Sequence, residues 1–206
     1  IDGTATIVDP DTGFSVPDAL SLSRNMLIYQ WVESGPKPST SSKSRDEEFS
    51  YSLEWKQHPA ASSSDFSDNE ASQTRINPHS ATRATGLARR DWPAAAGPVS
   101  VGGIALGAVA HARLVKAANS DVQPTAAAAR GMILPFPVQA ADAMGSWSAR
   151  QALQVDPACG CFTTADPPSA PRAGDLRVHY RASAPAGAVV IGALSSGGAL
   201  GPWRAP

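Results

Sequence analysis

The stretch Phe49-Ser50-Tyr51-Ser52-Leu53-Glu54-Trp55-Lys56 decides the fold, because its apolar and polar side chains alternate strictly. Successive side chains of a β-strand point to opposite faces, so this period of two places every aromatic side chain on one face. The stretch therefore predicts a strand with an aromatic face and a polar face.

A second strand is predicted upstream, over roughly residues 19–33. One of its faces is apolar, and the other begins polar and then becomes apolar. The apolar face carries Leu20, Leu22, Met26 and Ile28, and the other face becomes apolar at Leu27, Tyr29 and Trp31. A strand that is apolar on both faces is covered on both faces. A polar loop from Gly35 to Ser44 separates the two strands, so a long hairpin is expected.

The C-terminal part predicts a second hairpin. Leu176, Val178 and Tyr180 alternate with polar residues, a turn follows at residues 183–187, and 188–194 forms an apolar strand. Helical spacing of Leu106, Val109, Ala110 and Leu114 predicts a helix after Ile104, and a second helix is expected over 140–153. The predicted fold class is α+β, with a largely antiparallel sheet built from two long hairpins with intervening helices.

Length and composition favour one domain over residues 1–206. The chain has 206 residues, 17 basic and 18 acidic, and a net charge of -1. This balance gives no electrostatic basis for binding nucleic acid. No apolar run reaches the roughly 18 to 20 residues that a membrane helix needs. Because the chain starts at Ile1 and ends just after strand-like sequence, we expect a water-soluble excerpt of a membrane protein.

The sequence offers no constellation that predicts catalysis, a cofactor or a metal. The four histidines lie out of helical or strand reach of one another, and neither a nucleophile elbow nor a phosphate loop is present. Cys159 and Cys161 are one residue apart. They form either a local disulfide in an oxidising compartment or two free thiols in a loop.

The aromatic face of the hairpin is the candidate interaction surface. It comprises Tyr29, Trp31, Phe49, Tyr51 and Trp55. Aromatic side chains at strand spacing pack in a core or, where they are exposed, provide a surface for a partner. The sequence leaves both alternatives open.

Several strings, in order, resemble the transmembrane protein 43 family. They are Leu20-Ser21-Leu22-Ser23-Arg24, Tyr29-Gln30-Trp31-Val32-Glu33, Phe49-Ser50-Tyr51, Glu54-Trp55, Ser63-Ser64-Asp65-Phe66, Asn77-Pro78 and Gly174-Asp175-Leu176-Arg177-Val178. The similarity extends from about Asp9 to about Leu194. The chain departs from the family at Leu27-Ile28, where Glu-Met is usual, and little of 117–173 can be matched. The family's four membrane spans are absent from this chain.

The resemblance implies the large domain between the first and second spans, on the lumenal side of the endoplasmic reticulum or inner nuclear membrane, or the periplasmic side in a bacterium. It further implies a non-enzymatic scaffold that associates with itself and with other membrane proteins, joined to the membrane through spans outside this chain. Two alternatives are a binding module for a lipid or other apolar ligand and a hydrolase with a dispersed triad.

Overall fold

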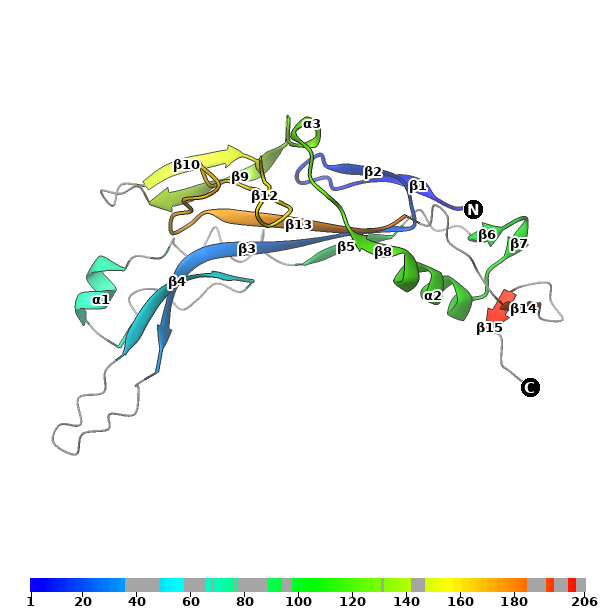
Figure 1. Cartoon of the computed structure of the whole chain (residues 1–206), viewed down its shortest axis with the longest axis horizontal. Helices are drawn as coiled ribbons and strands as arrows, with labels where there is room; N and C mark the ends of the chain where they lie inside the picture. The colour runs from blue at the N-terminus through cyan, green and yellow to red at the C-terminus, as the bar shows by residue number, and fades with distance from the viewer. Residues whose placement is uncertain are drawn as a thin grey trace. The chain divides into compact units, whose positions relative to one another are not determined.

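The structure is a computed structural model (Figure 1). It describes residues 1–35, 49–57, 66–67, 69–75, 77, 89–93, 98–130, 132–141, 147–184, 192–194 and 200–202. Most of the predicted hairpin loop and most of the predicted C-terminal turn lie outside these residues.

The described residues are rich in strands and contain short helices. The strands are β1 (Ala5–Val8), β2 (Ser15–Ala19), β3 (Ser21–Ser34), β4 (Ser50–Lys56), β5 (Arg90–Pro93), β6 (Ser100–Val101), β7 (Ile104–Ala105), β8 (Asn119–Asp121), β9 (Ile133–Ala141), β10 (Trp147–Ala152), β11 (Gln154–Asp156), β12 (Cys161–Thr163), β13 (Leu176–Ser183), β14 (Gly192–Leu194) and β15 (Leu200–Pro202). The helices are α1 (Asn69–Thr74), α2 (Ala108–Ala118) and α3 (Ala126–Ala129).

The chain divides into two compact units, and each unit is assembled from separate segments. Unit 1 comprises residues 1–24, 89–123 and 179–206, and unit 2 comprises 25–88 and 124–178. The prediction of one domain over the whole chain stays a prediction.

Unit 2 contains the larger part of the main antiparallel sheet, in the strand order β11-β12-β13-β3-β4. β3 pairs with β4 in antiparallel register from Ile28↔Lys56 to Ser34↔Ser50, which joins the two stretches predicted to be neighbours. On its other edge β3 meets β13, where the Tyr29 amide donates to the Asp175 carbonyl at 2.9 Å. Met26 and Ile28 on one face of β3 are buried, as predicted.

Unit 1 is built around the first residues of β3. Leu22 pairs with Trp92 of β5, and the Leu20 amide donates to the Ser183 carbonyl at 2.7 Å. The helix predicted after Ile104 is present as α2, and it packs Leu114 against Leu20 and Val99. Its Val109, which the spacing placed on the buried face, is 52% exposed. None of the described helices is long and apolar enough to cross a membrane.

The helix predicted over 140–153 is wrong. This region contains the end of β9 and all of β10, which pair in antiparallel register from Trp147↔Ala141 to Arg150↔Val138. Alanine has the highest helix propensity, but propensities differ by less than about 1 kcal/mol per residue, and pairing of the backbone groups between strands overrides that preference.

The second predicted hairpin is not found among the described residues. β13 lies between β12 and β3, and its last residues pair with β8. The described part of 188–194, β14, pairs with β15 instead. Since both edges of β13 are occupied by other described strands, β14 has no edge of β13 to join.

Candidate functional site

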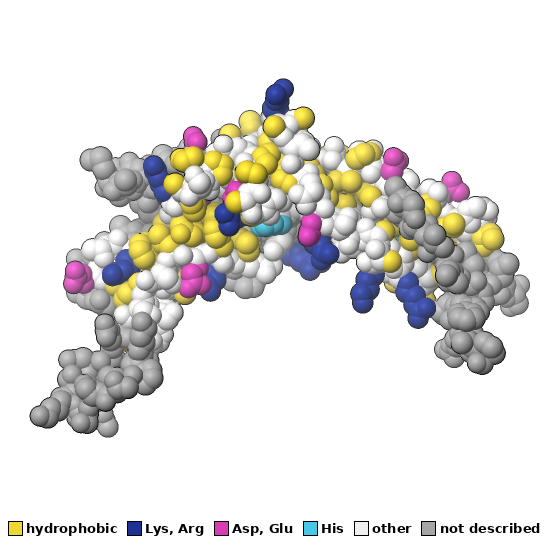
Figure 2. Space-filling model, in the orientation of Figure 1, with side chains coloured by type: hydrophobic (Ala, Val, Ile, Leu, Met, Phe, Trp, Pro, Cys, Tyr) yellow, Lys and Arg dark blue, Asp and Glu magenta, His cyan; other side chains and the backbone are white. Residues whose placement is uncertain are grey.

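Strands β3 and β4 build an aromatic surface in unit 2. The register sets Tyr29 opposite Trp55 and Trp31 opposite Leu53, so their side chains share one face. The Tyr29 and Trp55 rings lie 4.9 Å apart at 38°. All four side chains are half-buried. In Figure 2, hydrophobic side chains gather over β3 and β13 of this unit, with charged side chains at the margin of the patch.

Pairing of β3 with β4 places the five predicted surface residues on, or directly before, two neighbouring strands. Tyr51 lies opposite Glu33 and Tyr29 opposite Trp55, while Phe49 directly precedes β4 and is half-buried. Their function as a partner surface stays a prediction. All five side chains are half-buried, so they belong neither to a fully buried core nor to a fully exposed surface.

Two arginines lie over the rings of this surface. The Arg75 guanidinium, just after α1, is 4.6 Å from the Tyr51 ring centroid and 5.7 Å from that of Trp31. The Arg177 guanidinium is 4.3 Å from the Trp55 ring and also binds the Asp156 carboxylate at 2.8 Å. Cations over aromatic faces are attracted by the ring quadrupole, so the arginines hold these rings in place.

The carboxylate of Glu33 anchors the end of the surface. It accepts hydrogen bonds from the Tyr51 hydroxyl at 2.8 Å, from the Ser67 amide at 2.6 Å and from the Ser67 hydroxyl at 2.7 Å. Partial desolvation raises the pKa of Glu33, but the hydrogen bonds outweigh it and hold the pKa below its ordinary value. The neighbouring Phe66 ring lies 5.4 Å from the Tyr51 ring.

The side chain of Asn77 occupies the edge of β3 beyond the end of β13. Its carbonyl oxygen accepts from the Trp31 amide at 2.7 Å, and its amide donates to the Trp31 carbonyl at 2.9 Å. Asn77 is buried, with 3% of its surface exposed. It therefore takes the place that a further strand residue would have in the ladder.

The hydrogen bonds of Trp31 define the outer edge of β4. Because the N–H and C=O of Trp31 point away from β4, Trp31 and Leu53 form a non-hydrogen-bonded pair of the antiparallel ladder. The N–H and C=O of Leu53, and by the same alternation those of Trp55, then point away from β3. No strand in the described part of the chain pairs with this outer edge.

Unit 1 contains a buried polar cluster that sequence reasoning missed. Arg24 Nη1 donates to the two carboxylate oxygens of Asp9, at 3.0 Å to Oδ1 and 2.7 Å to Oδ2. The Tyr180 hydroxyl donates to the same carboxylate at 2.6 Å. Thr12 donates to the same carboxylate at 2.9 Å, and Arg24 Nη2 binds Asp11 at 2.7 Å. Asp9 and Arg24 are 0% and 1% exposed. The cluster links the turn after β1 to β3 and to β13, so we assign it a structural role.

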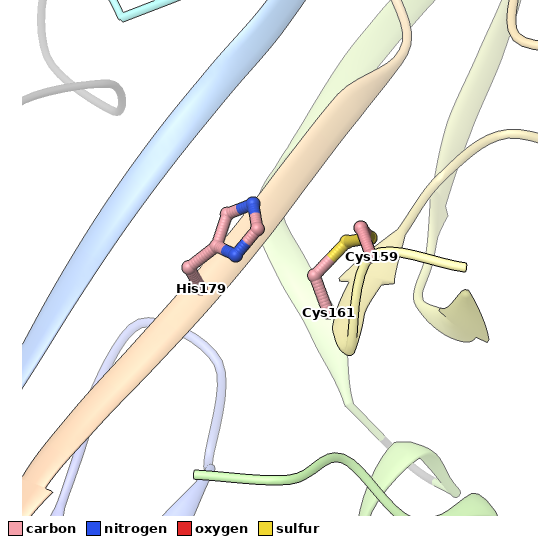
Figure 3. Close-up of side chains that lie close together, drawn as sticks. All are labelled: Cys159, Cys161 and His179. Carbon is pink, nitrogen blue, oxygen red and sulfur yellow. A yellow bond between two sulfur atoms is a disulfide. The ribbon is translucent and has the colours of Figure 1, made fainter. Parts of the chain in front are cut away.

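The two cysteines are joined by a disulfide (Figure 3). Cys159 lies in the turn between β11 and β12, and Cys161 begins β12. Of the two alternatives left open by the sequence, the structure has the disulfide.

A comparison with protein families supports the resemblance that the strings quoted above carry. The family model described as "Transmembrane protein 43" matches residues 28–206. No curated protein and no solved structure matches the chain. The matched region contains the second half of β3, together with β4, Asn77 and β13, and it includes most of the strings that carry the resemblance. Because the match covers most of its length, the chain belongs to the transmembrane protein 43 family.

Proposed function

We propose that this chain is a non-enzymatic interaction domain of a multi-span endomembrane protein, one that associates with itself and organises membrane-protein complexes. Membership of a family of membrane proteins supports the membrane context. The proposed location is the lumenal side of the endoplasmic reticulum or inner nuclear membrane, or the periplasmic side in a bacterium.

The single observation that carries the proposal is the outer edge of β4. Leu53 and Trp55 direct their backbone N–H and C=O groups away from β3, as the ladder alternation at Trp31 requires. An edge of this kind is a template for a strand from another chain. The charged side chains of β4, Glu54 and Lys56, pair with each other at 2.6 Å near its C-terminal end.

The aromatic surface would add side-chain contacts to the backbone hydrogen bonds that a strand forms with this edge. A strand added beside β4 would place alternate side chains next to Leu53 and Trp55, on the face that also carries Tyr29 and Trp31. Half-buried aromatic rings already held by arginines lose little conformational entropy on binding. A second copy of the chain offers the same edge and the same rings, so an antiparallel pairing of two β4 strands is self-complementary.

The experiment compares Leu53→Pro with Leu53→Ala by sedimentation velocity over a concentration series. Proline removes the outward N–H, and an edge strand tolerates it because that N–H makes no bond within the sheet. Alanine removes the same side chain and keeps the N–H. We expect the unchanged chain to associate, Leu53→Ala to associate up to about tenfold more weakly, and Leu53→Pro to remain monomeric.

Circular dichroism of both variants checks that the sheet is retained. A chain that is monomeric at every concentration and captures no membrane protein would contradict the proposal. Equal association of the proline and alanine variants would exclude the β4 edge as the interface. Trp55→Ala then measures the aromatic contribution separately, since it leaves every backbone donor in place.

A further inference from the structure

The disulfide between Cys159 and Cys161 contributes little to holding the fold, because other interactions already fix its turn. β11 and β12 pair from Gln154↔Thr163 to Asp156↔Cys161. The Asp156 carboxylate accepts from the Ala158 amide at 3.0 Å and binds Arg177 at 2.8 Å. A disulfide restrains the unfolded chain less as the loop that it closes becomes shorter, and this loop is the shortest that contains an intervening residue.

The turn presents one sulfur and buries the other. Cys159 is half-buried in the turn, while Cys161 is 1% exposed. Gly160 between them has a φ of +59°, a conformation that favours glycine. An incoming thiolate can therefore reach Cys159 and not Cys161.

The surroundings also suit the reduced state. The Cys159 sulfur lies 3.6 Å from the Asp156 carbonyl oxygen, which can accept a hydrogen bond from the thiol once the disulfide is opened. The ladder between β11 and β12 and the bond from the Ala158 amide to Asp156 do not involve the sulfur atoms, so we expect the sheet to keep its arrangement on reduction. A dithiol held at this spacing is prepared to close again.

From these observations we propose that Cys159-Gly160-Cys161 is a thiol–disulfide exchange site, which takes electrons from a protein dithiol or from glutathione. The incoming thiolate attacks the Cys159 sulfur, a mixed disulfide forms, and the Cys159–Cys161 bond breaks with Cys161 leaving as a thiolate that takes up a proton. A second thiol of the donor then displaces Cys159. Two thiols are oxidised to one disulfide, and the cysteine pair of the chain is reduced by the same two electrons.

The placement of the turn suggests that the donor is carried by a protein. Arg177 joins Asp156, at the base of the turn, to the Trp55 ring of the aromatic surface. A protein that contacts this surface and carries its cysteines on the side of Arg177 would present them to the turn that holds Cys159. This step goes beyond the proposed interaction function and does not depend on self-association through β4.

The test incubates the whole 206-residue chain, folded, in buffers with reduced and oxidised glutathione at set ratios, and counts thiols by alkylation and mass spectrometry. We expect the pair to exchange within minutes and to titrate between dithiol and disulfide across the series, with an unchanged circular dichroism spectrum. The Cys161→Ser variant should accumulate one glutathione on Cys159, because nothing resolves the mixed disulfide.

The matched variant Cys159→Ser should acquire glutathione at least tenfold more slowly, because its thiol is buried. A disulfide that is reduced only when the chain unfolds would overturn the proposal, and so would equal glutathione capture by the two variants. The wild-type titration needs no variant, so a folding defect in either variant leaves the test in force. Sedimentation velocity of the reduced chain measures self-association independently of thiol exchange, so a failure of the exchange proposal can be distinguished from a failure of the β4 interface.

Discussion

The Tyr180 hydroxyl donates a hydrogen bond of 2.6 Å to the carboxylate of Asp9, which lies 171 residues earlier in the chain. The ring of Tyr180 stacks on Phe14 at 4.2 Å, so it is held on its face as well as at its hydroxyl. The contact ties β13 to the turn after β1 within unit 1. Because Asp9 is fully buried, each donor to its carboxylate compensates part of the cost of burying the charge.

We predict that Tyr180→Phe lowers the free energy of unfolding by about 1–3 kcal/mol, since it leaves a buried carboxylate with one donor fewer. The matched control is Tyr29→Phe, whose ring contact with Trp55 is unchanged and which should alter stability by less than about 0.5 kcal/mol. Urea denaturation at pH 7 measures both. Equal effects of the two substitutions would show that the Asp9 contact contributes nothing specific.

The same tyrosine predicts a loss of stability at alkaline pH. Burial, together with the hydrogen bond to Asp9, raises the pKa of Tyr180 above its ordinary value. The unfolded chain therefore loses this proton first, so the contribution is complete below the unfolded pKa of about 10 and is lost as the pH rises above it. The urea midpoint of the wild type should fall more steeply between pH 9 and 11 than that of Tyr180→Phe. Parallel curves would contradict this prediction.

The first hairpin could be predicted from sequence because its strands carry a clear period of two. Arg24 shows where the same pattern fails: it lies on the buried face of β3 between Leu22 and Met26, whereas the apolar pattern does not include it in the expected core. The gap in that apolar row was a signal that a charge is buried there. Its partner Asp9 lies in a turn, and no local pattern connects the two residues.

The β9–β10 pairing could not be predicted for a different reason. Its alanines favour a helix by intrinsic propensity, and the deciding interaction is the pairing between two strands, as in Ala149↔Gln139, which no local pattern reveals. The placement of β13 beside β3 likewise depends on pairing across more than a hundred residues. Arg75 belongs to a segment with no periodic signal in the sequence. The alternation around Arg177 predicts a strand but does not identify Trp55 as its neighbour, so the aromatic residues of the surface could be predicted while the arginines over their rings could not.

Asn77→Ala should destabilise the chain by about 1–3 kcal/mol, because it leaves the N–H and C=O of Trp31 without the side chain that now pairs with both. Hydrogen exchange should show faster exchange of the Trp31 amide. Asn77→Asp is the matched control, since its carboxylate can still accept from that amide but cannot donate to the carbonyl. It should preserve most of the amide protection, and protection lost equally in both variants would contradict the pairing.

Glu33 predicts the acid dependence of the aromatic surface. Its hydrogen bonds with Ser67 and Tyr51 outweigh desolvation and lower its pKa, so the folded chain releases this proton more readily than the unfolded chain does. The stability that Glu33 contributes is therefore present above its unfolded pKa of about 4.3 and is lost as the pH falls through the folded pKa. Glu33→Gln should reduce stability at pH 7 and have little effect at pH 3, as measured by urea denaturation. Tyr51→Phe, which removes one donor and keeps the ring under Arg75, should show a smaller difference of the same sign. A Glu33→Gln effect that is the same at both pH values would mean that the carboxylate charge is not what holds Ser67 and Tyr51 in place.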